Sequence, residues 1–289
     1  MTFDDQNVDV SGVDDRRGRG GGAIALGGGG LGVVGLIVYL LINVLGGGSG
    51  TSGLPGASGV DVGGTGETSE QLSARCNADG AIDKYDDCYL IKVYGEINEV
   101  WTASLQGYHK PKLAFFEQAV QTGCGQASSE VGPFYCPPDE EIYIDIGFLN
   151  ALQSRFGAQG RYAQAYILAH ETGHHLQSLL GTEQRIRQQM QADPSRRNAL
   201  SITMELQADC YAGVWSTLAD RAGNVSITQN EVDQALNAAQ AVGDDRIQKT
   251  TTGRVDPESW THGSAAQRKA SFQRGFTGGS VDSCQVAGT

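Results

Sequence analysis

The stretch that decides the fold and the chemistry is AYILAHETGHHLQSLLG, residues 165–181. It contains His170 and His174, four residues apart, with Glu171 directly after the first. In an α-helix, residues four apart lie one turn apart on one face, so both imidazoles can reach a single ion. Glu171 then lies beside the open coordination position, where a carboxylate can take a proton from a water molecule. The pattern predicts a metal site on a buried helix; the alternative is a buried helix whose histidines are only hydrogen-bonded.

The residues around this motif favour burial of the site. The helix is expected from about Gly160 to Gly181, and the approach to the motif, residues 167–169, is apolar. Gly173 leaves room for another segment to cross the helix closely. His175 points roughly 100° away from its neighbour around the helix. We therefore expect His175 to be a surface or supporting group rather than a ligand.

A catalytic zinc site usually has three protein ligands and one open position, so a third ligand is needed. The extended motif H-E-x-x-H-x-x-G-x-x-H is absent, because Gln177 and Leu180 occupy its last two fixed positions. His109 and His262 are possible donors. They are weaker candidates than the acidic residues of the next long helix.

That helix contains MELQADCYAGVW, residues 204–215, in which Glu205 and Asp209 are again one turn apart. Buried carboxylates without partners are unfavourable. Both are satisfied if Glu205 binds the metal and Asp209 accepts the far N–H of a ligand imidazole. Two alternatives stay open: the roles of the two acids are exchanged, or the pair is solvated or salt-bridged.

The remaining elements place the chain in the α+β class, mostly helical with a small sheet. Residues 140–149, EEIYIDIGFL, alternate isoleucine with polar or aromatic residues and predict a strand. Helices are expected over residues 91–105, 198–220 and 264–276. Another begins at Thr228, whose spacing from Glu231 fits a capping box.

Four stretches in this order resemble the bacterial neutral zinc metallopeptidase family, whose motifs are gluzincin-like and whose members are typically membrane-anchored. They are FYCPPDEEIYID, AQAYILAHETGHHLQ, ELQADCYAGVW and THGSAAQR, and the resemblance covers residues 70–276. It implies a zincin-like domain that binds one Zn²⁺ through His170, His174 and Glu205. It also implies that Glu171 is the general base and that Asp209 orients a ligand histidine.

Two further residues gain roles from the resemblance. THGSAAQR, residues 261–268, has the His-to-Arg spacing of a segment in membrane-associated gluzincins, whose histidine can bind the oxyanion. His262 is thus expected to be catalytic, with a structural role as the alternative, and Arg268 to clamp Asp209 or another acid. Gly263 stands where those proteins have proline.

The strand at Ile142–Ile146 is expected either to be an edge strand that binds an extended substrate or to be an ordinary core strand.

The N-terminal part of the chain predicts a membrane anchor. Residues 23–45 carry no charge and give about 35 Å of helix, enough to cross a bilayer core of roughly 30 Å. Arginines precede this run, so residues 1–22 are expected to be cytoplasmic and the rest extracytoplasmic. Residues 46–69 read as a flexible Gly/Ser linker, and residues 70–289 as the metallopeptidase domain. A cleaved signal peptide or a soluble helix are the alternatives for 23–45.

All six cysteines follow the expected anchor, and an even number outside the cytoplasm indicates disulfides. The simplest pairing is Cys76–Cys88, Cys124–Cys136 and Cys210–Cys284, although fifteen connectivities are possible.

The net charge of −12 argues against binding nucleic acid.

The sequence as a whole predicts a membrane-anchored zinc metallopeptidase that acts on a peptide or protein substrate outside the cytoplasm. Two alternatives stay open: a catalytically silent zinc-containing binding or scaffold module, and a zinc hydrolase of a non-peptide amide of the cell wall.

Overall fold

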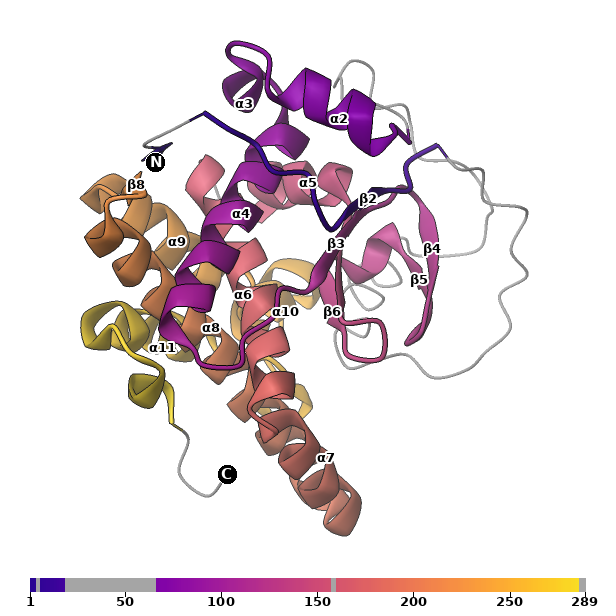
Figure 1. The fold of residues 1–289 in the computed structure, drawn as a ribbon. Helices are drawn as coiled ribbons and strands as arrows, with labels where there is room; N and C mark the ends of the chain where they lie inside the picture. Colours follow the sequence, from indigo (N-terminus) through magenta and orange to yellow (C-terminus); the bar gives the residue numbers. More distant parts are fainter. Residues whose placement is uncertain (4–5, 19–65, 157–159, 286–289) are drawn as a thin grey trace.

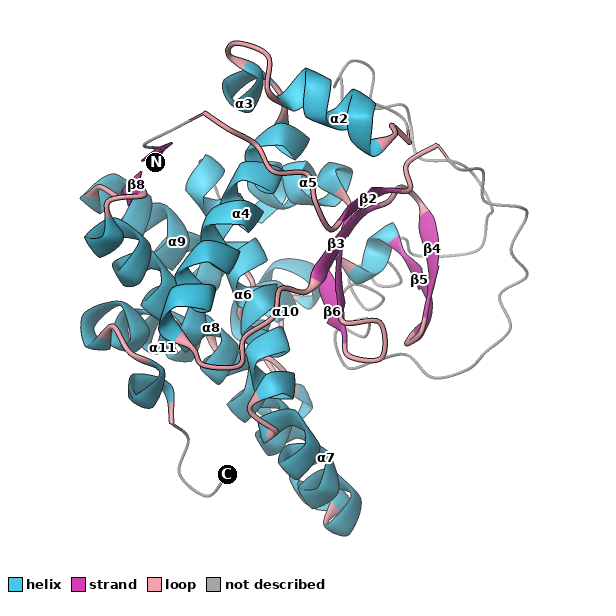
Figure 2. Ribbon diagram, viewed as in Figure 1, coloured by secondary structure: helices cyan, strands magenta, loops and turns pink. Residues whose placement is uncertain are grey.

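The computed structural model describes residues 1–3, 6–18, 66–156 and 160–285. This part of the chain is mostly helical, with small sheets (Figures 1 and 2). The helices are α2 (Ser69–Cys76), α3 (Ala81–Lys84), α4 (Asp86–Ser104), α5 (Ile146–Phe156), α6 (Arg161–Leu179), α7 (Thr182–Ala192), α8 (Arg197–Ala222), α9 (Gln229–Ala241), α10 (Asp244–Thr252) and α11 (Ala265–Gly278). The strands are β1 (Thr2–Phe3), β2 (Val13–Asp15), β3 (Lys112–Phe115), β4 (Ala119–Thr122), β5 (Gly125–Ser128), β6 (Phe134–Cys136), β7 (Glu141–Ile144) and β8 (Val225–Ser226).

Helix α6 lies at the centre of the helical layer and contacts α4, α8 and α9. Almost its whole length is buried, including the polar side chains of its central turns. Buried polar groups need hydrogen-bond partners, so this helix has to be surrounded by elements that supply them. Helix α11 packs along α8, and two glycines allow the close approach. A Cβ at Gly213 would meet the Phe272 carbonyl, and a Cβ at Gly275 would meet the Cys210 carbonyl.

The largest sheet has the strand order β2-β3-β7-β6 and lies beside the helices (Figure 2). The β2–β3 and β3–β7 pairs are parallel, and the β6–β7 pair is antiparallel. Strand β7 is therefore hydrogen-bonded on both sides, and β6 is the outer strand nearest α6, which it contacts. Strands β4 and β5 form a separate hairpin, and β1 pairs with β8.

The strand predicted over residues 140–149 is shorter than expected. It ends at Ile144, and helix α5 begins at Ile146. Asp145 causes the change, because its side chain accepts the backbone N–H of Phe148 as a helix cap does. The Thr228 capping box is confirmed, since its amide donates to Glu231 at 2.8 Å and helix α9 begins at the next residue.

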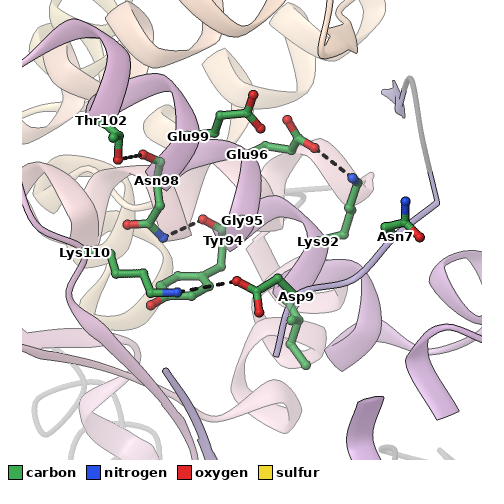
Figure 3. Close-up of a pocket in the computed structure, with 11 residues that line it drawn as sticks. Asn7, Asp9, Lys92, Tyr94, Gly95, Glu96, Asn98, Glu99, Thr102 and Lys110 are labelled. Carbon is green, nitrogen blue, oxygen red and sulfur yellow. Dashed lines mark hydrogen bonds and ion pairs between the residues drawn. The ribbon is translucent and has the colours of Figure 1, made fainter. Parts of the chain in front are cut away.

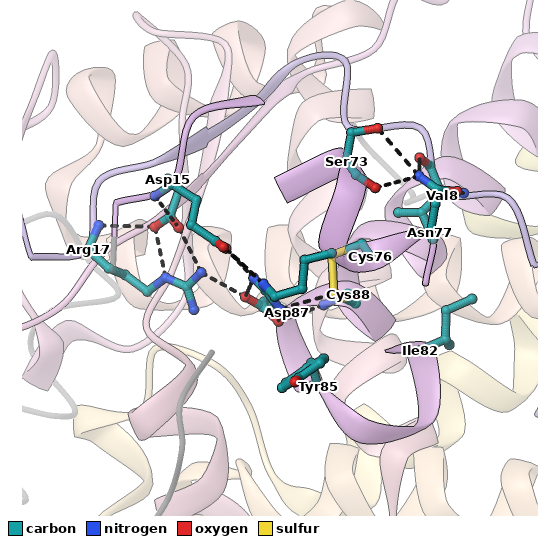
Figure 4. Close-up of a disulfide and its surroundings, with 12 residues drawn as sticks. Val8, Asp15, Arg17, Ser73, Cys76, Asn77, Ile82, Tyr85, Asp87 and Cys88 are labelled. Carbon is teal, nitrogen blue, oxygen red and sulfur yellow. Dashed lines mark hydrogen bonds and ion pairs between the residues drawn. A yellow bond between two sulfur atoms is a disulfide. The ribbon is translucent and has the colours of Figure 1, made fainter. Parts of the chain in front are cut away.

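The described residues before the predicted anchor, 1–3 and 6–18, lie against the domain. Strand β2 joins the main sheet beside β3, and the buried Arg17 donates to Asp15 and to Asp87 at the start of α4 (Figure 4). Arg75 donates to the same Asp87 carboxylate at 2.7 Å, next to the Cys76–Cys88 disulfide. Paired charges make burial of these groups tolerable.

The prediction of a membrane anchor is not supported. In the ranges that the structure describes, no helix has the length and apolarity needed to cross a bilayer. The predicted span, residues 23–45, lies outside the described residues, as does nearly all of the predicted linker. A single-pass topology would also put β2 and β3 on opposite sides of a membrane, yet they are neighbours in one sheet. We therefore correct three predictions: the transmembrane helix in the fold, the membrane as a partner, and the single-pass location.

Candidate metal centre

The centre is formed where α6 and α8 cross (Figure 1). The crossing is close because Gly173 has no side chain. A Cβ built on Gly173 would lie 2.9 Å from the Cα and 3.0 Å from the carbonyl oxygen of Ala208. The expectation that Gly173 admits a close neighbour is confirmed, and that neighbour is the helix carrying the two acids.

His170, His174 and Glu205 come together at this crossing, with one possible ligand atom from each within 4.8 Å of the others. The Nε2 atom of His170 lies 3.2 Å from Glu205 Oε2, and that of His174 lies 3.5 Å from Glu205 Oε1. In a tetrahedral zinc site with bonds of about 2.0–2.1 Å, ligand atoms lie roughly 3.3 Å apart. The donor set and its spacing therefore fit a zinc ion.

Glu171 lies next to this triad and is 6% exposed. Its Oε2 atom is buried and has no hydrogen-bond partner among the described residues. Burial raises the pKa of Glu171, and the imidazoles of His170 and His174 oppose the rise. A buried carboxylate oxygen without a partner is unfavourable unless something in the site uses it. This oxygen is the feature of the centre that bears most directly on chemistry.

The charges of the centre are strongly coupled. Burial opposes the imidazolium of His170, but Asp209 and then Glu205 outweigh it and raise the pKa of His170 to about 10. Burial alone would raise the pKa of Glu205, and the neighbouring imidazoles, led by that of His262, hold it well below its ordinary value. Metal binding requires neutral imidazoles, so an ion entering the centre has to displace the proton of His170.

Asp209 is fully buried behind His170 and is hydrogen-bonded to its ring. Its Oδ1 atom lies 2.8 Å from His170 Nδ1, and Arg268 donates to both carboxylate oxygens, at 2.8 and 2.9 Å. Tyr166 donates to the same carboxylate. Burial raises the pKa of Asp209, but Arg268 and then His170 lower it below its ordinary value. The anionic Asp209 thus leaves Nε2 of His170 directed at Glu205.

Tyr166 was not predicted as a site residue, although its position in the sequence carries a recognisable signal. Tyr166 lies four residues before His170, on the same helix face one turn earlier. Its phenol is completely buried, and burial raises its pKa well above the ordinary value. The hydroxyl therefore stays protonated and serves as a donor to Asp209.

His262 lies in a loop that is held by Asp244, a residue not expected to take part in the site. The Asp244 carboxylate accepts the backbone N–H groups of Thr261, His262 and Gly263, at 2.7, 2.7 and 3.0 Å. His262 is 7% exposed, and its Nδ1 lies 2.9 Å from the Thr261 hydroxyl. Gly263 has φ +89°, a conformation closed to proline, whose φ is fixed near −65°. This explains why glycine stands at this position.

The other two histidines are not part of the triad. His175, expected at the surface or in support, is 0% exposed. It donates from Nε2 to the His109 carbonyl at 2.7 Å, so its Nδ1 accepts the Tyr135 hydroxyl of strand β6 at 3.0 Å. It therefore ties α6 to the outer strand. The ring of His109 lies 3.3 Å from Glu140 and is exposed, away from the centre.

The strand proposed as a substrate edge does not have that position. β7 lies between β3 and β6, so its backbone groups are paired on both sides. Ile142 and Ile144 are fully buried, as in a core strand, which is the second reading of that segment. The outer strand on the α6 side is β6.

Three disulfides occur in the described part of the chain, with the pairing expected from the sequence: Cys76–Cys88, Cys124–Cys136 and Cys210–Cys284. The third joins α8 to the C-terminal turn, Val281–Cys284.

A separate cavity of about 340 Å³ opens between the N-terminal segment and α4 (Figure 3). It is lined by the Lys92–Glu96 ion pair and by Asp9 and Lys110, and none of the metal-centre residues lines it.

Comparison with known proteins gives the family. The sequence model of the family described as "Putative neutral zinc metallopeptidase" matches residues 3–287. The chain is 40% identical over 287 residues to the uncharacterized protein YpfJ of Escherichia coli strain K12, covering 96% of this chain and 95% of that protein. It is 41% identical over 222 residues to the uncharacterized proteins Mb2605 of Mycobacterium bovis and Rv2575 of Mycobacterium tuberculosis, covering 74% of each chain. No solved structure matches the chain.

Proposed function

Because the chain belongs to the neutral zinc metallopeptidase family, we propose that it hydrolyses peptide bonds at the centre formed by His170, His174 and Glu205. The observation that carries this proposal is the arrangement of three ligand atoms within 4.8 Å of one another beside a buried, unpartnered carboxylate oxygen of Glu171. A structural zinc site needs four protein ligands and no base. Three ligands next to a free carboxylate favour a catalytic site.

The proposed roles follow from position. A zinc ion held by the triad would polarise the scissile carbonyl and lower the pKa of the attacking water towards neutrality. Glu171 takes the proton from that water and later passes it to the leaving amine. Burial raises the pKa of Glu171 above its ordinary value, and this direction suits a carboxyl group that both accepts and returns a proton.

Asp209 and His262 have supporting roles in the proposed reaction, one at a metal ligand and the other at the substrate carbonyl. Asp209, itself fixed by Arg268, holds the tautomer of His170 that leaves Nε2 free for the metal. His262 is proposed to donate a hydrogen bond to the oxyanion that forms on the carbonyl, an interaction worth roughly 3 kcal/mol in comparable enzymes. The backbone bonds to Asp244 keep its loop in place.

The proposal is tested by measuring metal content and peptide hydrolysis of the purified chain, beside Glu171→Gln. We expect one zinc ion per chain in both proteins and hydrolysis in the wild type alone. Removal of the metal by a chelator should abolish hydrolysis, and added zinc should restore it. Glu96→Gln is the matched control, because Glu96 is also buried with an unpartnered oxygen but lies on α4 outside the centre.

The outcomes separate the alternatives. Unchanged hydrolysis in Glu171→Gln would remove Glu171 from the mechanism. A wild type that holds zinc and cleaves no peptide in a diverse peptide library, but does cleave cell-wall amides, would make it a hydrolase of those bonds. Zinc without any hydrolysis would indicate a silent binding module, and absence of zinc from the folded chain would refute the centre.

A further inference from the structure

The second ligand histidine has a support that differs from that of the first. His174 Nδ1 lies 2.8 Å from the side-chain oxygen of Gln177, three residues later on α6. Gln177 is 0% exposed. Its amide nitrogen donates to the Met204 carbonyl at 2.8 Å and to the Gln207 side-chain oxygen at 3.1 Å, both on α8. Gln177 therefore joins the two helices that hold the centre.

The direction of these hydrogen bonds is fixed by backbone carbonyls. The Met204 carbonyl can only accept, so the Gln177 amide nitrogen has to face it and the Gln177 oxygen has to face His174. His174 Nδ1 is then the donor and carries the proton. The lone pair is left on Nε2, which lies 3.5 Å from Glu205 Oε1, where a metal would be bound. Gln177 thus selects the metal-binding tautomer of His174.

The orientation of the Gln207 side chain is fixed in the same way, and its hydrogen bonds lead to a disulfide. The Gln207 amide nitrogen donates to the Cys284 carbonyl at 2.9 Å, so its oxygen is left to accept from Gln177. Cys284 is bonded to Cys210, which follows Gln207 by three residues on α8. The disulfide holds the accepting carbonyl against the helix that carries Gln207.

The first ligand depends on none of these groups. His170 is oriented by Asp209, which is held by Arg268 and Tyr166. An anionic acceptor paired with a guanidinium is a strong partner. The support behind His174 is a chain of hydrogen bonds through the neutral side-chain amides of Gln177 and Gln207, which ends at the Cys284 carbonyl in the C-terminal turn. The geometry of this chain of amides therefore depends on that turn staying in place.

We propose that Gln177 is the positioning residue for His174, and that the Cys210–Cys284 disulfide, acting through Gln207, sets the metal affinity of the centre. The inference rests on the proposed function only in requiring that the centre binds zinc. Reduction by a dithiol transfers two electrons and two protons to the disulfide, gives two thiols and oxidises the dithiol. The freed turn no longer holds the carbonyl that directs Gln207, and zinc is bound more weakly.

The test measures zinc affinity of the full chain by competition with a chromophoric chelator, and the absorption spectrum of the Co²⁺-substituted protein. Gln177→Leu, Gln207→Leu and the double variant Cys210→Ala/Cys284→Ala avoid adding a thiol, which would itself bind zinc. We expect each to lower zinc affinity about 10- to 100-fold, the usual effect of losing a group that orients a ligand. The Co²⁺ spectrum should change in the same variants.

Matched controls separate positioning from general destabilisation. Gln164→Leu removes another buried glutamine of α6, whose amide nitrogen donates to Asn150. Cys76→Ala/Cys88→Ala removes a disulfide remote from the chain of amides. Both should bind zinc within about twofold of the wild type. Adding Gln207→Leu to the Cys210/Cys284 variant should give no further loss, because both changes break one chain of interactions.

The result that overturns the proposal is wild-type zinc affinity in a folded Gln177→Leu or Cys210→Ala/Cys284→Ala variant. If Gln177→Leu fails to fold, ¹⁵N NMR of the zinc-loaded wild type still tests it, because His174 should carry its proton on Nδ1 and an unprotonated Nδ1 contradicts the assignment. Wild-type protein that binds no zinc would instead refute the metal centre itself, which is a separate failure.

Discussion

The close crossing of α6 and α8 makes a sharp prediction for Gly173→Ala. The added Cβ would lie 2.9 Å from the Cα of Ala208, whereas carbon atoms in contact lie about 3.5–4.0 Å apart. Both partners are backbone-bound atoms inside helices, so no side chain can turn aside. The helices have to separate by roughly 0.6 Å or more.

This displacement is large compared with what a zinc site tolerates. His170 and His174 are on one side of the crossing and Glu205 is on the other. Metal–ligand distances in proteins vary by only about 0.2 Å around their normal values. A shift of roughly 0.6 Å therefore takes Glu205 out of range unless the backbone distorts further. We expect zinc affinity to fall at least about tenfold.

The effect on stability is the difference of two opposing contributions. Overpacking a well-filled core costs roughly 1–3 kcal/mol. Replacing glycine by alanine inside a helix stabilises by about 0.5–1 kcal/mol. We expect a net loss of roughly 0–2.5 kcal/mol in the unfolding free energy of the metal-free protein, measured by urea denaturation.

Gly95→Ala is the matched control, because Gly95 lies inside helix α4 and a Cβ there meets nothing within 4 Å. It should raise stability by about 0.5–1 kcal/mol and leave zinc binding unchanged. Gly173→Ala protein that binds zinc as tightly as the wild type would refute the view that this crossing sets the ligand spacing.

Three further predictions concern the charged groups. Arg268→Met removes the guanidinium that is hydrogen-bonded to both oxygens of the buried Asp209 and should destabilise the metal-free protein by up to about 3 kcal/mol in urea unfolding, because the His170 imidazolium remains beside the carboxylate. Asp244→Ala leaves the amides of residues 261–263 without their acceptor; we expect faster hydrogen exchange there and a lower kcat with unchanged zinc affinity. Burial raises the pKa of Asp87, but the guanidinium groups of Arg75 and Arg17 outweigh burial and lower that pKa below its ordinary value. Its stabilising contribution is therefore present above the unfolded pKa of about 3.9 and lost as the pH falls through the folded value. Asp87→Asn should flatten the acid side of a stability–pH curve, and an unchanged curve would contradict the pairing.

The sequence by itself determined the features that depend on residues close together in the chain. The spacing of His170 and His174 fixes their common face, because the helix repeat allows no other arrangement. Glu205 and Asp209 could be identified in the same way, because their spacing of four residues also places them on one helix face. Gly173 could be identified because a residue without a side chain lets another helix approach closely. Two of the three disulfides follow from the spacing of twelve residues between their cysteines, and the third joins the two cysteines that remain.

Local patterns were misleading where a helix cap or a tertiary contact competed with them. The alternation of residues 140–149 predicts a strand throughout, but Asp145 caps helix α5 and ends the strand at Ile144. The same strand could not be placed at an edge or in the interior from its own sequence, because its neighbours, β3 and β6, are separate segments. The arginines of the N-terminal segment were read as a signal of membrane orientation, and Arg17 instead pairs with Asp87 inside the domain.

Only the tertiary structure decided how the helices meet. That α6 crosses α8 at Gly173 and Ala208, that Gln177 reaches Gln207, and that Asp244 holds the loop of His262 are relations between helix faces. Within a helix, covalent geometry and hydrogen bonds fix the relative positions of side chains. Between helices, position is set by the packing of many side chains at once, and no short stretch of sequence contains that information.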